Sequence, residues 1–242
     1  MRILLVSDLH YTLKQLDWVT SIAGEFDLVV AAGDLLDISS IVEPDAQIAV
    51  VLEYLARMAA KTAVIACSGN HDLNANNEYG ERAAKWLDAA TASGVLVDGT
   101  RLETEHELVT VCPWWDGPNT RDVVGRQLAE DAALVGDRMW IWVYHAPPED
   151  SPTSWTGKRH YGDEALNAWI TQYQPAIVMC GHVHQSPFAD GGSWIDRIGT
   201  TVVLNAGRQI GPIPTCVELD TETALARWSS LEGVEEEPFV AV

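Results

Sequence analysis

The sequence predicts an α/β fold in which parallel strands alternate with helices. Three short apolar runs, at residues 2–7, 27–32 and 62–67, are rich in Leu, Ile, Val and Ala and lack polar alternation. Runs of this kind indicate strands that are buried on both faces. Segments with helical spacing follow the first two runs, and this order is typical of parallel strands joined by helical crossovers.

The first half of the chain is predicted to contain three strand–loop–helix units. The first helix is expected over residues 13–23, where apolar residues recur at helical spacing. The second helix is expected to run from Pro44, a residue favoured in the first helical turn, to Ala60. A third helix is expected over residues 78–92.

The second half of the chain changes to shorter strands with two helices between them. The two helices are expected at residues 120–135 and 163–173. The expected strands lie at residues 95–97, 108–111, 139–144, 176–180, 193–195, 201–204, 215–219 and 224–228. The acidic tail from about residue 232 is expected to be flexible. We predict a single domain over residues 1–242.

The charge of the chain argues against two kinds of partner. The chain has 35 acidic and 15 basic residues, which gives a formal net charge of −20. Long nucleic acids and anionic membranes require a basic surface, so we expect the chain to bind neither. The negative charge of the chain does not exclude a small phosphorylated substrate, because divalent cations can reverse the sign of the electrostatic field inside one pocket.

The compartment is predicted from the lack of export and membrane signals. No run approaches the roughly 18 apolar residues of a membrane span, and the first residues do not resemble a signal peptide. A cytoplasmic protein with reduced thiols is therefore expected. The four cysteines form no C-x-x-C pair, and Cys67 and Cys180 are expected to act as small buried apolar residues. Whether the chain forms a homo-oligomer stays open.

Residue types that bind metals stand at the ends of five expected strands. They are Asp8 and His10, then Asp34, then Asn70 and His71, then His145, then His182 and His184. Because the carboxyl ends of parallel strands meet at one edge of a sheet, these loops should converge. Carboxylate and amide oxygens and imidazole nitrogens are ligands of zinc, manganese and iron. A lone Asp–His pair is more often a surface or capping group, so the hypothesis of a metal site depends on the coincidence at five strand ends.

Two metal ions fit this set if one carboxylate bridges them, and Asp34 in the central loop is the natural bridge. Two ions about 3.5–4 Å apart clamp the attacking and leaving oxygens of a phosphoryl displacement and ionise a bridging water near neutral pH. Gly33, Gly69 and Gly181 each precede a candidate ligand. A residue without Cβ allows the backbone to approach a metal or substrate closely.

The spacing of these residues resembles that of the calcineurin-like metallophosphoesterases, from residue 3 to about residue 207. The matching blocks are Asp8-x-His10, Gly33-Asp34-x-x-Asp37, Gly69-Asn70-His71-Asp72, the lone His145 and Gly181-His182-x-His184. The resemblance implies an α/β fold that forms a four-layer αββα sandwich. In this fold two mixed β-sheets are flanked by helices, and a dinuclear metal site lies at the C-terminal strand ends.

The resemblance also implies a role for each residue. One metal would be held by Asp8, His10, Asp34 and His184, and the other by Asp34, Asn70, His145 and His182. His71 would protonate the leaving oxygen or steady the phosphate, and Asp72 would orient His71 through a hydrogen bond. The cofactors implied are two divalent or trivalent metal ions, with manganese, iron or zinc as the candidates.

One departure from the sequence pattern of the family narrows the kind of phosphoesterase that is expected. The protein Ser/Thr phosphatases of this family have an arginine shortly after the second aspartate of their block, whereas here Ile38 and Ser39 follow Asp37. The short chain is more like a bacterial phosphodiesterase that hydrolyses a small, cyclic-nucleotide-like diester by attack of a metal-bridging hydroxide. The alternatives are a phosphomonoesterase or nucleotide phosphatase, a nuclease for short substrates, and a non-catalytic protein-binding scaffold.

Six further residues are candidates for substrate contact. They are Trp114, Trp115, Trp155, Lys158, Arg159 and Asn205. The tryptophans stand in loops, where they would stack on a nucleobase or another flat group, or pack beneath a loop. The two basic residues would meet a phosphate at the mouth of the pocket, or be solvated. Asn205 resembles a position that the family often keeps near its site.

Overall fold

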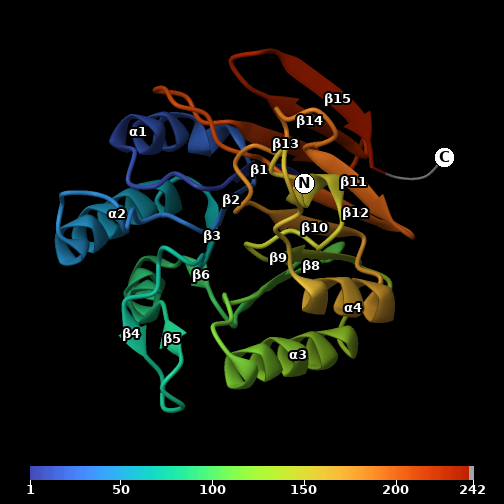
Figure 1. Ribbon diagram of the computed structural model, residues 1–242, viewed down its shortest axis with the longest axis horizontal. Helices are drawn as coiled ribbons and strands as arrows, with labels where there is room; N and C mark the ends of the chain where they lie inside the picture. The colour runs from blue at the N-terminus through green and yellow to red at the C-terminus, as the bar shows by residue number, and fades with distance from the viewer. Residues whose placement is uncertain (240–242) are drawn as a thin grey trace.

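The computed structural model describes residues 1–239, and Figure 1 shows their arrangement. The first sheet has seven strands in the order β15-β14-β13-β1-β2-β3-β6. Strands β1, β2, β3 and β6 are parallel to one another, and β13, β14 and β15 add antiparallel strands at one edge. Their bounds are β1 Arg2–Val6, β2 Leu28–Ala32, β3 Ala63–Cys67, β6 Leu96–Val97, β13 Cys216–Asp220, β14 Leu225–Ser229 and β15 Val234–Pro238.

The second sheet has six strands in the order β11-β12-β10-β9-β8-β7. Its four central strands are parallel, and β7 and β11 are antiparallel edges. Their bounds are β7 Arg101–Glu103, β8 Glu107–Val111, β9 Met139–Val143, β10 Ile177–Cys180, β11 Ile195–Ile198 and β12 Thr201–Asn205. Both sheets are therefore mixed, as expected.

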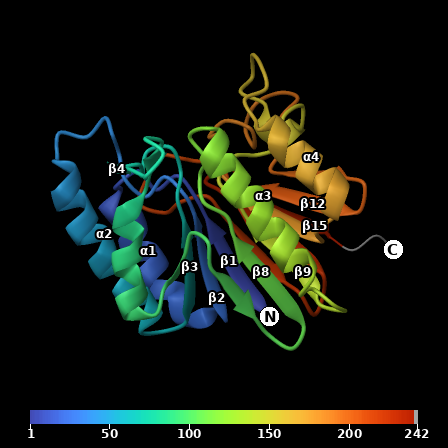
Figure 2. The same ribbon diagram turned by 90° about the horizontal axis from the view of Figure 1, so that it is seen from below.

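The two sheets pack face to face, and helices cover their outer faces. Alternate residues of β1 show the division, because Ile3 and Leu5 contribute to the core between the sheets while Leu4 and Val6 pack toward helices. Helices α1 (Leu13–Ile22) and α2 (Pro44–Ala59) cover the first sheet, and α3 (Pro118–Ala132) and α4 (Glu164–Tyr173) cover the second. Figure 2 shows these two helical layers on opposite sides of the strands. The expected four-layer αββα sandwich is confirmed.

The predicted helix over residues 78–92 is wrong. The chain forms a short hairpin of β4 (Ala75–Asn76) and β5 (Arg82–Ala83), followed by a 3-10 helix over Lys85–Ser93. The Asn77 side chain accepts hydrogen bonds from two backbone N–H groups of the turn, and Gly80 has a φ of 80°. Asparagine and glycine favour such a turn, which here prevails over the apolar spacing.

The acidic tail is ordered further than expected. Residues 234–238 form β15, which pairs antiparallel with β14. The Trp194 indole donates to Glu235 at 2.7 Å, and Glu236 lies 3.7 Å from Arg227. The expectation of flexibility from residue 232 is therefore wrong for this strand, and its remaining part, residues 240–242, lies outside the described residues. Among the described helices, none combines the length and apolarity needed to span a bilayer.

The four cysteines are all buried and unpaired. Burial raises the pKa of the Cys67 and Cys180 thiols well above the usual range, so both are neutral at pH 7. Cys67 packs in the core between the two sheets and Cys180 packs between the second sheet and its helices, so the prediction of small buried apolar residues is confirmed.

Candidate metal centre

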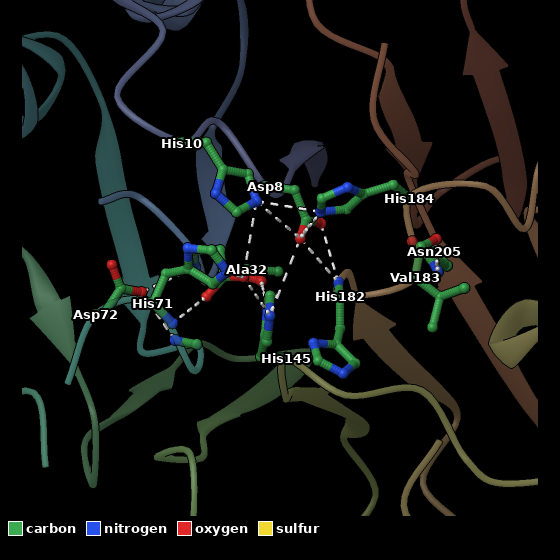
Figure 3. A network of polar contacts seen from close by, with 12 residues as sticks. Asp8, His10, Ala32, His71, Asp72, His145, His182, Val183, His184 and Asn205 are labelled. Carbon is green, nitrogen blue, oxygen red and sulfur yellow. Dashed lines mark hydrogen bonds and ion pairs between the residues drawn. The ribbon is translucent and has the colours of Figure 1, made fainter. Parts of the chain in front are cut away.

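The ends of β1, β2, β3, β9 and β10 meet at one edge of the two sheets, and their polar residues converge there (Figure 3). Three groups bring ligand atoms within 4.8 Å of one another. They are Asp8 with His10 and His184, His10 with Asp34 and His71, and Asp34 with His145 and His182. We call these residues except His71, together with Asn70, the ligand cluster.

The backbones of the first two loops are hydrogen-bonded to each other. The Asp8 N–H donates to the Gly33 carbonyl at 3.0 Å, and the His10 N–H donates to the Asp34 carbonyl at 2.9 Å. Asp8, His10 and Asp34 have φ values of 55°, 41° and 53°. A left-handed backbone at a residue with a side chain costs about 1–3 kcal/mol and tends to occur at functional sites.

The three glycines are required by close approach. A Cβ at Gly33 would lie 2.3 Å from His145 Nδ1, and one at Gly69 would lie 2.2 Å from Asp34 Oδ1. A Cβ at Gly181 would lie 2.5 Å from Asp8 Oδ2. Each glycine therefore allows a neighbouring loop to pack directly on a candidate ligand, as the sequence predicted.

Around Asp8, two imidazoles present Nε2 to the same space. His184 Nε2 lies 3.1 Å from both Asp8 Oδ1 and His10 Nε2. The backbone N–H of His182 donates to both Asp8 oxygens, at 3.1 and 3.0 Å. Burial raises the pKa of Asp8, but its contacts with His10 and His184 outweigh burial and hold that pKa well below its usual range.

Around Asp34, the nearest imidazole is that of His145, whose Nε2 lies 3.3 Å from Asp34 Oδ2. Burial raises the pKa of Asp34, but the charge of His145 lowers it further, so it stays below its usual value. The Asp34 charge in turn outweighs the burial of His145 and raises its pKa to about 10. Burial and the charge of His145 lower the pKa of His182 to about 4. His182 is therefore neutral, the form that ligates metals.

The donor set fits divalent cations. Asn70 Oδ1 and His145 Nε2 are buried and have no hydrogen-bond partner within residues 1–239. His145 Nδ1 lies 2.7 Å from the Ala32 carbonyl and donates to it, so Nε2 is the nitrogen that faces Asp34 and would bind a metal in place of a proton. Within residues 1–239, no lysine or arginine forms an ion pair with Asp8 or Asp34. Two buried carboxylates without a fixed cation are what a metal would neutralise.

Asp72 does not form the predicted hydrogen bond with His71. One carboxylate oxygen accepts the N–H groups of Asp34 and Gly69, both at 2.8 Å, and the other accepts those of Leu35 and Leu36, both at 3.0 Å. Asp72 thus braces the loop that carries Asp34. Burial and the Asp34 charge raise the pKa of Asp72 to about 7, against donors that favour the ionised form. The expected orienting hydrogen bond to His71 is therefore wrong.

His71 lies at the edge of the ligand cluster. Its Nδ1 accepts the Ile38 N–H at 3.4 Å, and its Nε2 lies 4.0 Å from Asp34 Oδ2. In the neutral ring the proton must then be on Nε2, which faces the cluster. Burial lowers the pKa of His71, although the Asp34 charge opposes this.

A cavity of about 810 Å³ begins at His182, and we call it the His182 cavity. Trp114 and Trp115 are among its lining residues, and their contact with substrate stays a prediction. The Trp114 ring also packs against metal-site histidines, with its centroid 5.3 Å from that of His182 and 5.6 Å from that of His145. Trp115 is held by its indole N–H, which donates to Asp163 at 2.7 Å.

The other predicted rim residues lie elsewhere. Trp155 is outside the His182 cavity and donates its indole N–H to the Asp190 carbonyl at 2.9 Å. Lys158 and Arg159 are exposed and also outside that cavity, with the Arg159 guanidinium 5.4 Å from the centroid of the Tyr161 ring.

Asn205 is 0% exposed and cannot contact substrate at the surface. Its amide donates to the Thr153 and Val183 carbonyls and to the Ser186 hydroxyl, at 2.9, 3.1 and 3.0 Å. It therefore holds the turn that carries His182 and His184 (Figure 3). The prediction of a substrate contact is wrong for Asn205, because sequence position alone does not show which way a side chain points.

Three residues that line the cavities next to the ligand cluster were not predicted from the sequence. Tyr161 stacks on His182, with centroids 5.0 Å apart and an interplanar angle of 20°. Asp163 accepts hydrogen bonds from Trp115 and Tyr144. Arg208 lines a cavity together with His184. None of them stands in a motif or at a strand end next to a ligand, so the sequence carried no local signal for them.

A second cavity of about 500 Å³, the His71 cavity, lies at His71. His71, Asp72, Asp37 and Arg82 are among its lining residues. The ligand cluster is therefore bordered by cavities both at His182 and at His71.

The calcineurin-like phosphoesterase family model matches residues 1–186, and the chain belongs to this family. Members are dinuclear, metal-dependent phosphoesterases, so the protein is a hydrolase of phosphoric ester bonds. A search of curated proteins finds no match.

Solved structures of low sequence identity share the fold. The protein TT1561 of Thermus thermophilus is 14% identical, with a TM-score of 0.63 and 98% of each chain covered. A dimetal phosphatase from Danio rerio is 12% identical, with a TM-score of 0.59, covering 100% of this chain and 99% of its own. GAP50, the anchor in the inner membrane complex of Plasmodium, is 8% identical, with a TM-score of 0.56 and coverage of 100% and 89%.

Proposed function

We propose that the protein hydrolyses a small phosphodiester at the ligand cluster. The observation that carries this proposal is the pair of cavities at His182 and His71, of about 810 and 500 Å³. A diester has two organic groups on one phosphorus, and space on two sides of the cluster accommodates both. A monoester needs only one such space.

In this proposal Asp8, His10, Asp34 and His184 hold one metal ion, and Asp34, Asn70, His145 and His182 hold the second. When bound, the ions supply Lewis acidity and lower the pKa of water, and manganese, iron and zinc all suit this mixed oxygen and nitrogen set. The buried, unpartnered atoms of Asn70 and His145 support their assignment as ligands.

His71 is proposed to protonate the leaving oxygen. A water oxygen adds to phosphorus, the bond from phosphorus to the leaving oxygen breaks, and that oxygen takes a proton from Nε2 of His71. The proton that the attacking water releases returns to Nε2, which restores the neutral ring of His71. Its Nδ1 accepts the Ile38 N–H, so the neutral ring keeps the required hydrogen on Nε2. The His71 cavity would then receive the leaving alcohol.

The discriminating experiment compares bis-p-nitrophenyl phosphate with p-nitrophenyl phosphate. Protein stripped of metal should be inactive on both, and added manganese, zinc, nickel or magnesium should restore turnover with preference for the diester. Faster hydrolysis of the monoester would make the protein a phosphomonoesterase or nucleotide phosphatase. Preference for a short oligonucleotide over both would make it a nuclease.

A non-catalytic scaffold is the second candidate, because GAP50 is described as an anchor and shares the fold. The complete ligand cluster argues against it. A protein that binds two metals yet hydrolyses none of the esters above would support the scaffold. The four unpaired, buried thiols support the further proposal of a cytoplasmic, reducing location.

A further inference from the structure

Arg208 is held beside the candidate ligand His184. It follows β12, and its backbone N–H donates to the His184 carbonyl at 3.1 Å. The preceding Gly207 has a φ of 69°, its N–H donates to Asn205 at 2.9 Å, and a Cβ there would lie 2.5 Å from Pro187. The backbone position of Arg208 relative to the ligand cluster is therefore fixed on both sides.

The Arg208 side chain lines a third cavity that borders the cluster. This His184 cavity has about 470 Å³ and is lined by Thr156, His184, Gln185, Phe188, Ala189, Arg208 and Ile210. No carboxylate is in this lining. The Arg208 Nε is buried without a hydrogen-bond partner, and no ion pair involves Arg208 within residues 1–239.

The other two cavities have the opposite charge balance. Arg121 in the His182 cavity is accompanied by four acids, which are Asp116, Glu149, Asp163 and Glu164. In the His71 cavity the Arg82 guanidinium donates to the Leu73 carbonyl at 2.6 Å, beside Asp37, Glu43, Asp45 and Asp72. An anion that approaches the cluster is therefore disfavoured in both of these cavities and favoured in the His184 cavity.

We propose that Arg208 binds a second anionic group, a phosphate or carboxylate, that branches from the ester arm which the substrate retains and whose body occupies the His182 cavity. This inference rests on the proposed phosphodiesterase function. A guanidinium binds either oxyanion through two parallel hydrogen bonds. Phe188 and Ile210 add apolar walls to the same cavity. The volume at Arg208 exceeds what an oxygen of the scissile phosphate alone requires.

Two p-nitrophenyl esters test this proposal. Thymidine 5′-(p-nitrophenyl phosphate) has one anion, and its 3′-phosphorylated form has a second anion on the retained arm. Wild type should have the lower KM for the 3′-phosphorylated ester. Arg208→Ala should raise that KM by about tenfold or more relative to the KM of the other ester. Arg208→Lys should fall between, because it keeps the charge without the planar fork. Arg126→Ala removes an equal charge from an exposed position on α3 and should match wild type on both esters.

The outcomes separate this inference from the proposed function. An equal rise of both KM values in Arg208→Ala would place the arginine on the scissile phosphate and overturn the proposal. If wild type hydrolyses neither ester, the phosphodiesterase function fails. The affinities of the protein for thymidine 3′,5′-bisphosphate and for thymidine 5′-monophosphate, measured by calorimetry, then decide the inference. It stands only if the bisphosphate binds more tightly to the wild type and Arg208→Ala removes that difference. A carboxylate source is tested by replacing the 3′-phosphate with a 3′-carboxymethyl ether.

Discussion

At the residue scale, Asp72 differs most from its expected role. Its four acceptor contacts reach the backbone of the Asp34 loop and Gly69, whereas His71 is hydrogen-bonded to Ile38. The two neighbours in sequence therefore act on different parts of the site. Mutations at Asp72 and at His71 can therefore show whether Asp72 stabilises the loop that carries Asp34 or forms a hydrogen-bonded pair with His71.

Asp72→Asn should destabilise the metal-free protein by about 2–4 kcal/mol, because an amide has one acceptor oxygen and sets N–H against buried N–H donors. Chemical unfolding of stripped protein measures this change. His71→Ala is the matched control, because its side chain is one-fifth exposed and leaves no comparable set of donors unpaired. Equal stability of the two variants would contradict the bracing role.

His71→Ala should lower kcat for a diester with an alkyl leaving group by about 10²–10⁴-fold, the usual contribution of a general acid, and much less for bis-p-nitrophenyl phosphate, whose nitrophenolate leaves without a proton. Metal content should stay at the wild-type level, because the proposed ligand sets do not include His71. Both quantities are measured on the same preparation, by steady-state kinetics and elemental analysis. Loss of a metal ion from His71→Ala would instead make it a ligand, as its position near His10 and Asp34 allows.

At the scale of elements, strands and ligand loops could be predicted because their signals are local. A buried strand followed by glycine and a polar residue is visible in the sequence, and each such loop ended at the ligand cluster. The hairpin of β4 and β5 could not be predicted in this way. Asn77 and Gly80 favour its turn, and Glu81 beside this turn also contacts the start of α3, which lies far along the chain.

Glu81 makes that contact and caps α3 from outside the helix. Its carboxylate accepts the backbone N–H groups of Asn119 and Thr120, at 2.9 and 2.7 Å. Desolvation raises the pKa of Glu81, but its hydrogen bonds with Thr120 and Asn119 together outweigh this and lower the pKa to about 2. Since the folded pKa lies below the ordinary 4.5, the stabilisation is present above about pH 4.5 and is lost as pH falls toward 2.

Glu81→Ala should therefore lower the Tm at pH 7, and its difference from wild type should shrink as the pH is lowered from 4.5 toward 2. Thermal scans of both proteins across this range measure the effect. Glu130→Ala, at an exposed position on the same helix, should show no such trend. A Tm difference for Glu81→Ala that is constant across the range would argue against a capping carboxylate.

At the scale of the whole molecule, the roles of Asn205, Trp114 and Arg208 could not be predicted because they depend on packing between sheets and loops. Asn205 supports the turn that carries two histidines, and Trp114 packs on imidazoles that arrive from two other strands. The ligand cluster also depends on the packing of the two sheets against each other. Its residues come from β1, β2 and β3 of one sheet and from β9 and β10 of the other.

A metal bound at the cluster should therefore join the two sheets and stabilise the whole domain. At a free metal concentration of 100 times Kd, one site adds about 2.7 kcal/mol to the free energy of unfolding. For a domain of this size that corresponds to a rise in Tm of about 5–10 °C. Buried carboxylates at Asp8 and Asp34 gain a cation on binding, which supplies the physical reason.

Thermal scans of stripped protein during a manganese titration measure this rise. Asp34→Asn should lose most of it, because the proposed bridge between the two ions is removed, and elemental analysis should show at least one ion fewer. Arg126→Ala should keep the full rise. An equal rise in Asp34→Asn and wild type would mean that manganese binds elsewhere, for example at the many surface carboxylates of a chain with net charge −20, and would contradict the assignment of the cluster.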